Sequence, residues 1–210
     1  MTANGKPRLI VVAGPNGSGK TSITEQLLRH TWMEGCEYIN PDNIARDKYG
    51  DWNSPDAVRS AARDASEIRH RCLAEKRSVA FETVLSTPEK IDFLREAKAA
   101  GFFVRLFFIG TDGPAINAMR VAMRVIQGGH DVPIPKIITR YSRSLANCLA
   151  AVQIADRAYI YDNSVDDVPA RLLFRTNDGQ VAKRYGTINA WATVVARNLV
   201  SASAPDSNRT

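Results

Sequence analysis

The amino-acid sequence predicts an α/β fold with a mainly parallel sheet of five strands. Short apolar runs such as Leu9–Ala13 and Phe102–Ile109 are typical of strands buried on both faces of a parallel sheet. Segments with apolar residues at helical spacing separate these runs, as crossover helices do between parallel strands. The sequence contains no internal repeat and no linker, so we expect a single domain over residues 1–210.

The composition excludes several classes of protein. Lys and Arg number 28 against 22 Asp and Glu, which gives a net charge of +6, and the hydrophobic share of 44% argues against a wholly disordered chain. No apolar run approaches the roughly 18 residues of a membrane span, and Met1–Arg8 lacks the apolar region of a secretory signal. Three cysteines lie far apart without disulfide or zinc spacing, which favours a cytoplasmic protein: Cys36, Cys72 and Cys148.

The first half of the chain alternates strands and helices. Leu9–Ala13 is followed by a helix over Lys20–His30 and by a short strand over Glu37–Ile39. Another helix begins after Ser54, because a capping residue, a proline and an acid follow one another there. Its apolar positions recur at helical spacing: Val58, Ala61, Ala62, Ala65, Ile68, Cys72 and Leu73.

The middle of the chain continues this alternation. Ser78–Glu82 and Phe102–Ile109 are predicted strands, and the helix between them begins near Pro88 and ends at Gly101. The next helix begins near Pro114 and ends at the glycines after Gln127. It carries three apolar residues at helical spacing: Met119, Met123 and Ile126.

The last third of the sequence predicts one more strand and an antiparallel hairpin. A helix over Pro135–Ala155 leads into a fifth strand over Arg157–Tyr161. An Asn-Asp-Gly turn then joins Arg171–Arg175 to Val181–Tyr185, which is a hairpin signal. A helix over Asn189–Val200 follows, and residues 201–210 form a small polar tail that we expect to be frayed.

A glycine-rich loop joins the first strand to the first helix, and it matches the pattern GxxxxGK[ST]. Glycines let backbone N–H groups curl around phosphate oxygens, and the helix N-terminus adds partial positive charge. Lys20 can reach the β- and γ-phosphates, and the Thr21 hydroxyl can bind Mg²⁺. We therefore expect ATP and Mg²⁺ as cofactors, with a plain tight turn as the alternative. The expected nucleotide-binding residues are Gly14, Pro15, Asn16, Gly17, Ser18, Gly19, Lys20, Thr21 and Ser22.

Polar residues follow the second and third strands, where the carboxyl edge of a parallel sheet binds ligands. Asn40 and Asp42 come after Glu37–Ile39, and the Asp42 carboxylate could accept a hydroxyl proton or cap the following helix. Glu82 ends the third strand and could face the same cleft or solvent. Thr83 and Ser86 could bind the acceptor or satisfy turn backbone.

Arginines gather in the segment after the fourth strand. Arg120 and Arg124 lie one helical turn apart, and Arg140 follows on the next helix. Guanidinium groups on a closing helical lid can neutralise the charge of a transferred phosphoryl group, whereas such pairs elsewhere are often solvated faces. Gly128 and Gly129 could form a hinge, and His130 could point into the cleft or pack in its loop.

These motifs, in this order, resemble the zeta-toxin-like P-loop kinases over roughly residues 8–165. The resemblance rests on the loop Gly14–Thr21, Asn40-Pro41-Asp42, Glu82-Thr83, Arg120-Val-Ala-Met-Arg124, Gly128-Gly129-His130, Val132-Pro133, Arg140-Tyr141 and Asp162-Asn163-Ser164. From position, this last motif could lie near the nucleotide or form a turn. The resemblance implies a P-loop NTPase three-layer sandwich with an adenylate-kinase-like core. It also implies phosphorylation of the sugar 3′-hydroxyl of UDP-N-acetylglucosamine, and a toxin whose partner is a separate antitoxin.

Carried over to this sequence, the resemblance implies a role for each matching residue. Lys20 and Thr21 hold the ATP phosphates and Mg²⁺, and Asp42 is the base. Glu82 binds the acceptor, and the helix of Arg120 and Arg124 contacts the γ-phosphate. The sequence departs from the family in having no clear separate module for the uridine, and its acceptor-side loops over residues 47–54 and 85–89 are compact.

The sequence thus favours an enzyme that transfers the γ-phosphoryl group of ATP to a small hydroxyl acceptor, such as a nucleotide-sugar. The alternative is a nucleotide-gated nucleic-acid-binding protein or a kinase of polynucleotide ends, which the charge of +6 permits. The basic residues are spread out, and no basic run interleaved with aromatic residues marks a strand-binding groove, which argues against nucleic acid as a partner.

Overall fold

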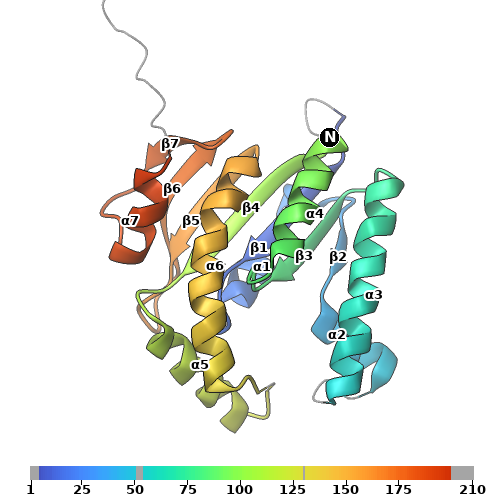
Figure 1. Ribbon diagram of the computed structural model, residues 1–210, viewed down its shortest axis with the longest axis horizontal. Helices are drawn as coiled ribbons and strands as arrows, with labels where there is room; N and C mark the ends of the chain where they lie inside the picture. Colours follow the sequence, from blue (N-terminus) through green and yellow to red (C-terminus); the bar gives the residue numbers. More distant parts are fainter. Residues whose placement is uncertain (1–4, 51–53, 130, 200–210) are drawn as a thin grey trace, which may run out of the picture.

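The computed structural model describes residues 5–50, 54–129 and 131–199. Seven strands form one sheet in the order β2-β3-β1-β4-β5-β6-β7 (Figure 1). Their bounds are β1 Arg8–Ala13, β2 Glu37–Ile39, β3 Val79–Thr83, β4 Phe103–Gly110, β5 Arg157–Asp162, β6 Arg171–Asn177 and β7 Gln180–Arg184. The five strands from β2 to β5 pair in parallel, whereas β6 and β7 are antiparallel.

The predicted parallel sheet of five strands is confirmed, but the whole sheet has seven. The hairpin of β6 and β7 does not stand apart from the sheet: β6 pairs with β5 along its length. This pairing uses backbone N–H and C=O groups of β5 that would otherwise form an open sheet edge.

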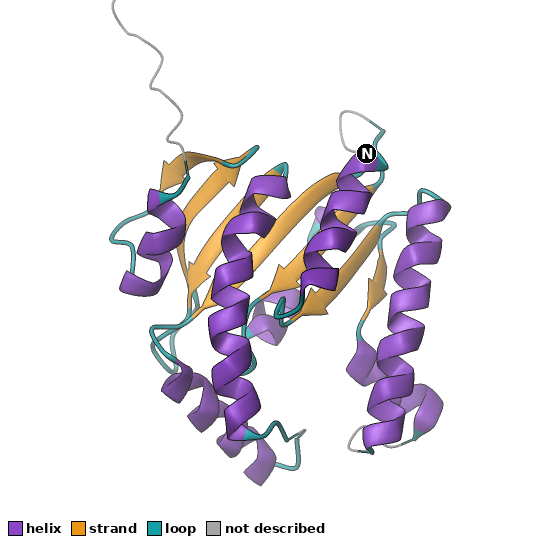
Figure 2. Ribbon diagram, viewed as in Figure 1, coloured by secondary structure: helices purple, strands orange, loops and turns teal. Residues whose placement is uncertain are grey.

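The helices cover the two faces of the sheet unequally (Figure 2). Helices α3, α4, α6 and α7 lie on one face, and α1 with the short 3₁₀ helix η1 lies on the other. Helices α2 and α5 lie beyond the carboxyl edge of the strands (Figure 1). The bounds are α1 Lys20–Leu28, η1 Thr31–Met33, α2 Pro41–Tyr49, α3 Pro55–Ala74, α4 Pro88–Ala99, α5 Pro114–Ile126, α6 Ile134–Ile154 and α7 Ala190–Arg197.

The central strand β1 shows why the chain forms layers. Leu9 and Val11 face the larger core beneath α3, α4 and α6, and Ile10 and Val12 face the smaller core beneath α1. All four side chains are almost completely buried. A strand with apolar residues on both faces is stable only between two covering layers, so the three-layer sandwich follows from the sequence of β1.

The starts of α3, α4, α5 and α6 lie where the sequence predicts them, because proline fixes the first turn of each. Helix α2 also begins with a proline, Pro41, a start that was not predicted. Ser54 precedes α3 without a capping hydrogen bond from its side chain. Met119, Met123 and Ile126 lie on α5 but are largely exposed. No helix in the described ranges is long and apolar enough to cross a membrane. The predicted frayed tail lies outside these ranges.

Candidate active site

The loop between β1 and α1 has the backbone of a phosphate cradle. Gly14, Gly17 and Gly19 have φ angles of 148°, 73° and 88°, which side-chain-bearing residues rarely adopt. A Cβ atom on Gly17 would lie 2.5 Å from the carbonyl oxygen of Asn117, and one on Gly19 would lie 2.2 Å from the side-chain nitrogen of Asn163. The glycines of the motif are therefore required by both backbone conformation and packing.

Two asparagines hold this loop in place from opposite sides. Asn117 of α5 donates from its side-chain amide to the carbonyl of Asn16 at 2.5 Å. Asn163, just after β5, donates in the same way to the carbonyl of Ser18 at 2.9 Å. Asn163 therefore contacts the loop, as one of the two interpretations of Asp162-Asn163-Ser164 anticipates. The role of Asn117 was not predicted, because no local sequence pattern marks it.

Lys20 folds back over the loop that precedes it. Its ammonium group donates to the carbonyl oxygens of Gly14 and Pro15, both at 2.9 Å. Burial lowers the pKa of this lysine from 10.5 to about 8. The two carbonyl contacts hold the ammonium group inside the cradle, where phosphate oxygens are expected to replace them.

Charged residues from four other segments surround Lys20. The carboxylates of Glu82 and Asp42 raise its pKa, and the guanidinium groups of Arg124 and Arg140 lower it, all to a smaller extent than burial does. These residues come from the end of β3, from α2, from α5 and from α6. The structure thus gathers five predicted site residues at one place on the carboxyl edge of the sheet.

A chain of hydrogen bonds connects Asp42 to Glu82. The Asp42 N–H donates to the Asn40 side-chain oxygen at 2.9 Å, and the Asn40 amide donates to the Tyr38 hydroxyl at 3.3 Å. Tyr38 in turn donates to Glu82 at 2.9 Å. Burial and the nearby Glu82 charge raise the pKa of Tyr38, so its hydroxyl remains a donor. Tyr38 was not predicted, because its role depends on the pairing of β2 with β3.

Asp42 lies in the first turn of α2, and its side chain is exposed. The capping residue of this helix is Asn40, so capping does not account for Asp42. Within the described residues, the Asp42 carboxylate takes part in no hydrogen bond or ion pair; only its backbone N–H is used. It is therefore available to a ligand in the cleft.

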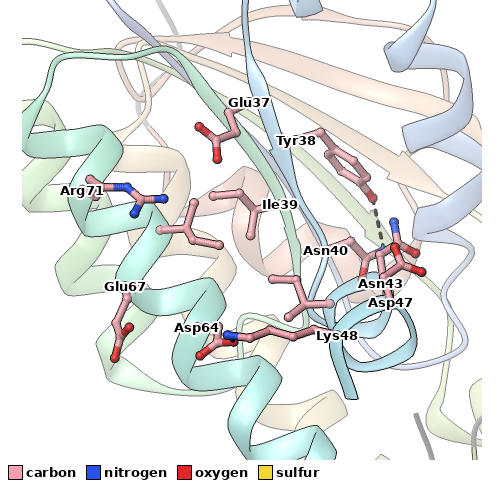
Figure 3. A pocket seen from close by; sticks show the side chains of 12 residues that line it. Glu37, Tyr38, Ile39, Asn40, Asn43, Asp47, Lys48, Asp64, Glu67 and Arg71 are labelled. Carbon is pink, nitrogen blue, oxygen red and sulfur yellow. Dashed lines mark hydrogen bonds and ion pairs between the residues drawn. The ribbon is translucent and has the colours of Figure 1, made fainter. Parts of the chain in front are cut away.

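A pocket of about 620 Å³ adjoins this hydrogen-bond chain (Figure 3). Tyr38 and Asn40 line it from the side of β2, and α2 and α3 close it. Lys48 of α2 and Asp64 of α3 form an ion pair of 2.7 Å across its wall. Neither Asp42 nor any residue of the phosphate-binding loop lines this pocket.

The loop after β3 is fixed by its own backbone contacts. The Thr83 hydroxyl accepts a hydrogen bond from the Leu85 N–H at 3.0 Å, and the Thr83 carbonyl accepts one from the Gly14 N–H at 3.2 Å. Asn147 of α6 donates to the Leu85 carbonyl at 2.9 Å. Of the two interpretations of Thr83, the structure shows the turn. Ser86 is half-buried on the same loop, and its contact with an acceptor stays a prediction.

Arg120 points away from the cluster around Lys20. Its guanidinium donates to Asp166 and to the Asn163 carbonyl, both at 2.7 Å. It lines a second pocket of about 280 Å³ that also includes Gly19 and Ser22. The two arginines of α5 therefore lie in different surroundings, and contact between Arg120 and the γ-phosphate stays a prediction.

The loop between α5 and α6 contains the predicted hinge. A Cβ atom on Gly129 would lie 2.6 Å from Cγ of Arg124, so the glycine allows this arginine to pack against the loop. Tyr141 of α6 donates to the Thr111 carbonyl at 2.6 Å and ties the lid to the end of β4. His130 lies outside the described residues.

The residues present fit a nucleoside triphosphate with a divalent cation. Asn16 Oδ1 and Ser18 Oγ are buried in the loop without a partner among the described residues. Thr21 is exposed in the first turn of α1, where a hydroxyl can reach a cation bound to phosphates. No group of three His, Cys, Asp or Glu side chains in the described ranges could hold a metal ion, so Mg²⁺ would take its ligands from phosphate oxygens, water and the Thr21 hydroxyl.

The chain is similar to several known proteins. A Haemophilus influenzae protein, named only as uncharacterized, is 30% identical over 135 residues, which are 64% of this chain and 92% of that protein. A chain of the PezAT chromosomal toxin–antitoxin system of Streptococcus pneumoniae superposes with a TM-score of 0.61 at 18% identity, covering 95% of this chain and 79% of that one. A chain of the AvrRxo1-ORF1:-ORF2 complex with ATP superposes with a TM-score of 0.66 at 17% identity. The superposition covers 97% of this chain and 66% of that one.

At these identities the two solved structures establish the fold alone, an α/β sandwich with a mainly parallel sheet. The family assignment comes from the sequence: residues 1–168 match the model of the family described as zeta toxin. The match includes the phosphate-binding loop, Asp42, Glu82 and both arginines of α5. The chain therefore belongs to the zeta-toxin family of P-loop kinases.

Proposed function

We propose that the protein transfers the γ-phosphoryl group of ATP to a hydroxyl of a small acceptor. The observation that carries this proposal is the meeting of Lys20, Asp42, Glu82, Arg124 and Arg140 at one edge of the sheet. A cation-lined phosphate site next to an available carboxylate is the arrangement that phosphoryl transfer to an alcohol needs.

On the donor side, the loop supplies backbone N–H groups and Lys20. The ammonium group exchanges the Gly14 and Pro15 carbonyls for phosphate oxygens when the nucleotide binds. Mg²⁺, held by Thr21 and the phosphates, would supply further charge neutralisation. The pocket beside Gly19, Ser22 and Arg120 is the place we propose for the nucleoside end of ATP.

On the acceptor side, Asp42 orients the hydroxyl and accepts its proton. The carboxylate is exposed toward the cleft, and Asn40 holds the backbone that carries it. Glu82, oriented by Tyr38, would accept hydrogen bonds from other hydroxyl groups of the acceptor. Positioning of this kind is where much of the catalytic effect in phosphoryl transfer originates.

The lid formed by α5 and α6 contributes positive charge. Arg124 and Arg140 lie close enough to Lys20 to lower its pKa, so they also act on a phosphoryl group bound there. Their charge would stabilise the equatorial oxygens during transfer. Closure of the lid would exclude water and prevent wasteful hydrolysis of ATP.

We infer that the acceptor is a nucleotide-sugar such as UDP-N-acetylglucosamine, with phosphorylation at a sugar hydroxyl. This inference rests on the family, and the pocket of about 620 Å³ beside Tyr38 has room for part of such a molecule. A separate antitoxin is the proposed protein partner, because PezAT is a toxin–antitoxin system. We further propose that the protein acts in the cytoplasm as the toxin of such a pair.

Incubation with γ-labelled ATP, Mg²⁺ and a panel of nucleotide-sugars tests the enzymatic proposal. We expect a labelled sugar product that Lys20→Ala and Asp42→Asn abolish or strongly reduce. An oligonucleotide with a 5′-hydroxyl belongs in the same panel. Label on that oligonucleotide and on no sugar would establish the alternative, a polynucleotide-end kinase.

Expression in a bacterial host tests the proposed role as a toxin. We expect growth arrest with the wild-type chain and normal growth with the double variant of Lys20 and Asp42. Arrest by the double variant would show that the toxic effect does not come from phosphoryl transfer.

A further inference from the structure

One face of the sheet is left open over β5, β6 and β7. Among the described helices, α1 and η1 lie on this side, behind β1 and the neighbouring strands (Figures 1 and 2), and Trp32 of η1 reaches only as far as Tyr159 of β5. Arg157 and Lys183 are exposed there, Tyr185 is 43% exposed, and Tyr161 and Arg175 are half-buried. These five side chains therefore meet solvent, whereas those on the other face pack beneath α6 and α7.

Strand pairing collects four cations on this side of the sheet, of which Arg105 is only 7% exposed. Arg105 of β4 is opposite Arg157 of β5, and Arg175 of β6 is opposite both Tyr159 of β5 and Lys183 of β7. Residues directly opposite each other in adjacent strands point to the same face. None of the four cations makes an ion pair with a described residue.

The positive charge of this face is not offset within the strands. Asp162 is the only acidic residue in β4, β5, β6 and β7 as described. It is turned to the opposite face, where it accepts a hydrogen bond from Trp191 of α7. Nε of Arg175 and both Nε and Nη1 of Arg105 are buried without a hydrogen-bond partner among the described residues. Arg105 therefore lies beneath the surface of this face, and the side chains of Arg157, Arg175 and Lys183 are the ones that reach solvent.

Aromatic rings alternate with these cations. The Arg105 guanidinium lies 3.8 Å from the ring centroid of Trp32 in η1, and the Lys183 ammonium lies 4.9 Å from that of Tyr185. Burial is the main cause that raises the pKa of Tyr161, and the neighbouring Tyr159 and Tyr185 raise it further. Two of these rings can be reached by solvent: Tyr161 on β5 and Tyr185, which follows β7.

We propose that this face binds single-stranded nucleic acid. We call it the basic sheet face, and its residues are Arg105, Arg157, Tyr161, Arg175, Lys183 and Tyr185. The Arg157, Arg175 and Lys183 side chains would contact phosphates and the exposed tyrosine rings would stack on bases, which is how sheet surfaces bind single strands. An acidic protein would match the positive charge, but its binding would not require aromatic rings between the cations. The nucleic acid bound here is a docking partner, because Asp42 lies beyond the carboxyl edge of the sheet and not on this face.

This proposal revises the sequence-based argument against nucleic acid. That argument rested on the lack of a basic run interleaved with aromatic residues. The four strands supply one or two residues each, and their register builds the interleaved arrangement in space. A linear search of the sequence does not detect an arrangement of this kind.

Fluorescence anisotropy of a labelled 15-nucleotide oligouridylate tests the proposal, with the full chain and without ATP. The matched pair of variants is Lys183→Ala and Arg184→Ala. The two residues are neighbours in β7, but Lys183 pairs with Arg175 on the open face and Arg184 pairs with Phe174 on the covered one. We expect Lys183→Ala to weaken binding about three- to tenfold and to reduce the salt dependence by about one counterion, and Arg184→Ala to leave both unchanged.

Two further variants separate stacking from charge. Tyr185→Leu keeps every charge and removes one ring, so it should also weaken binding at least about threefold. Arg157→Ala repeats the charge test on a different strand if a change in β7 disturbs the hairpin. All variants should keep wild-type ATP binding, since none of these residues contacts the phosphate-binding loop.

Three outcomes would overturn the proposal. The first is no binding of the oligouridylate at 50 mM salt, a condition under which about three basic contacts should suffice. The second is an equal effect of Lys183→Ala and Arg184→Ala. The third is displacement by polyglutamate as efficiently as by unlabelled oligouridylate, which would identify a general polyanion or acidic-protein surface.

Discussion

Asp42 and Asp56 occupy equivalent local positions, and this makes them a matched pair at the scale of single residues. Each follows a proline in the first turn of a helix, α2 and α3 respectively. Asp56 pairs with Arg59 at the surface, whereas the Asp42 carboxylate lies close enough to Lys20 to raise its pKa. Both variants to asparagine lose a similar favourable interaction with the helix dipole, about 0.3–1 kcal/mol.

We therefore expect Asp42→Asn to lower phosphoryl transfer about 10²-fold or more while ATP binding stays near the wild-type value. Asp56→Asn should leave both unchanged. Initial rates with the labelled acceptor and the ATP dissociation constant are the two measurements. Equal rates for wild type and Asp42→Asn would remove this carboxylate from the mechanism.

Lys20 gives a prediction about pH. Its pKa in the free protein is lowered by burial to about 8, and bound phosphate would favour the protonated form. Below pH 8 the lysine is already charged when ATP arrives. Above pH 8 binding must also take up a proton, so affinity for ATP should fall with rising pH, by up to about tenfold per pH unit.

Calorimetric titration of ATP between pH 7 and pH 10 checks this prediction. Lys20→Arg is the control, because the guanidinium group remains charged over the whole range and its affinity should not follow this profile. Affinity of the wild type that stays constant up to pH 9.5 would show that the free lysine keeps an ordinary pKa.

At the scale of elements, helix α5 places two arginines of one helical face in different environments. Arg120 contacts Asp166 and Asn163 next to the pocket proposed for the nucleoside, and Arg124 acts on Lys20. The two residues should therefore affect different kinetic constants. Arg120→Ala should raise the KM for ATP about tenfold with little change in kcat, because it loses contacts made equally in the ground state.

Arg124→Ala should instead lower kcat, by about 10³-fold if its charge acts mainly on the transition state. Steady-state kinetics at saturating acceptor separate the two effects. If Arg120→Ala lost as much kcat as Arg124→Ala, Arg120 would have to contact the γ-phosphate during transfer.

The elements also show which features of the fold could be predicted from the sequence. The phosphate-binding loop and the proline-initiated helices α3 to α6 were predicted because their signals are local, a handful of consecutive residues in each case. Tyr38 and Asn117 were missed because each acts through a neighbour that is far away in the sequence, Glu82 and Asn16. The seven-stranded sheet was missed for the same reason: a hairpin signal does not specify whether the hairpin joins an existing edge.

At the scale of the whole molecule, the C-terminal elements support the active site. The zeta-toxin match ends at residue 168, yet α7 contacts the core of the matched region. The Trp191 indole donates to the buried Asp162 at 2.8 Å, and its ring occupies the space that a Cβ atom on Gly110 would need. Asp162 also accepts from Ser164, which in turn accepts from the Asp112 N–H.

These contacts connect α7 to the phosphate-binding loop, because Asn163 lies between Asp162 and Ser164 and donates to the Ser18 carbonyl. We expect Trp191→Phe to lower the free energy of unfolding by about 1–3 kcal/mol, since a buried carboxylate oxygen loses a donor. The same variant should weaken ATP binding, because the position of Asn163 depends on its neighbours.

Thermal unfolding and ATP titration of the same preparations test both parts. Thr193→Ala is the control: its hydroxyl donates to the Asn189 carbonyl within the first turn of α7 and reaches no residue of the site. It should leave ATP affinity unchanged even if the helix is slightly less stable. If Trp191→Phe lowered stability and left ATP affinity at the wild-type value, the C-terminal elements would support the sheet without positioning the loop, and the coupling through Asp162 and Asn163 would be wrong.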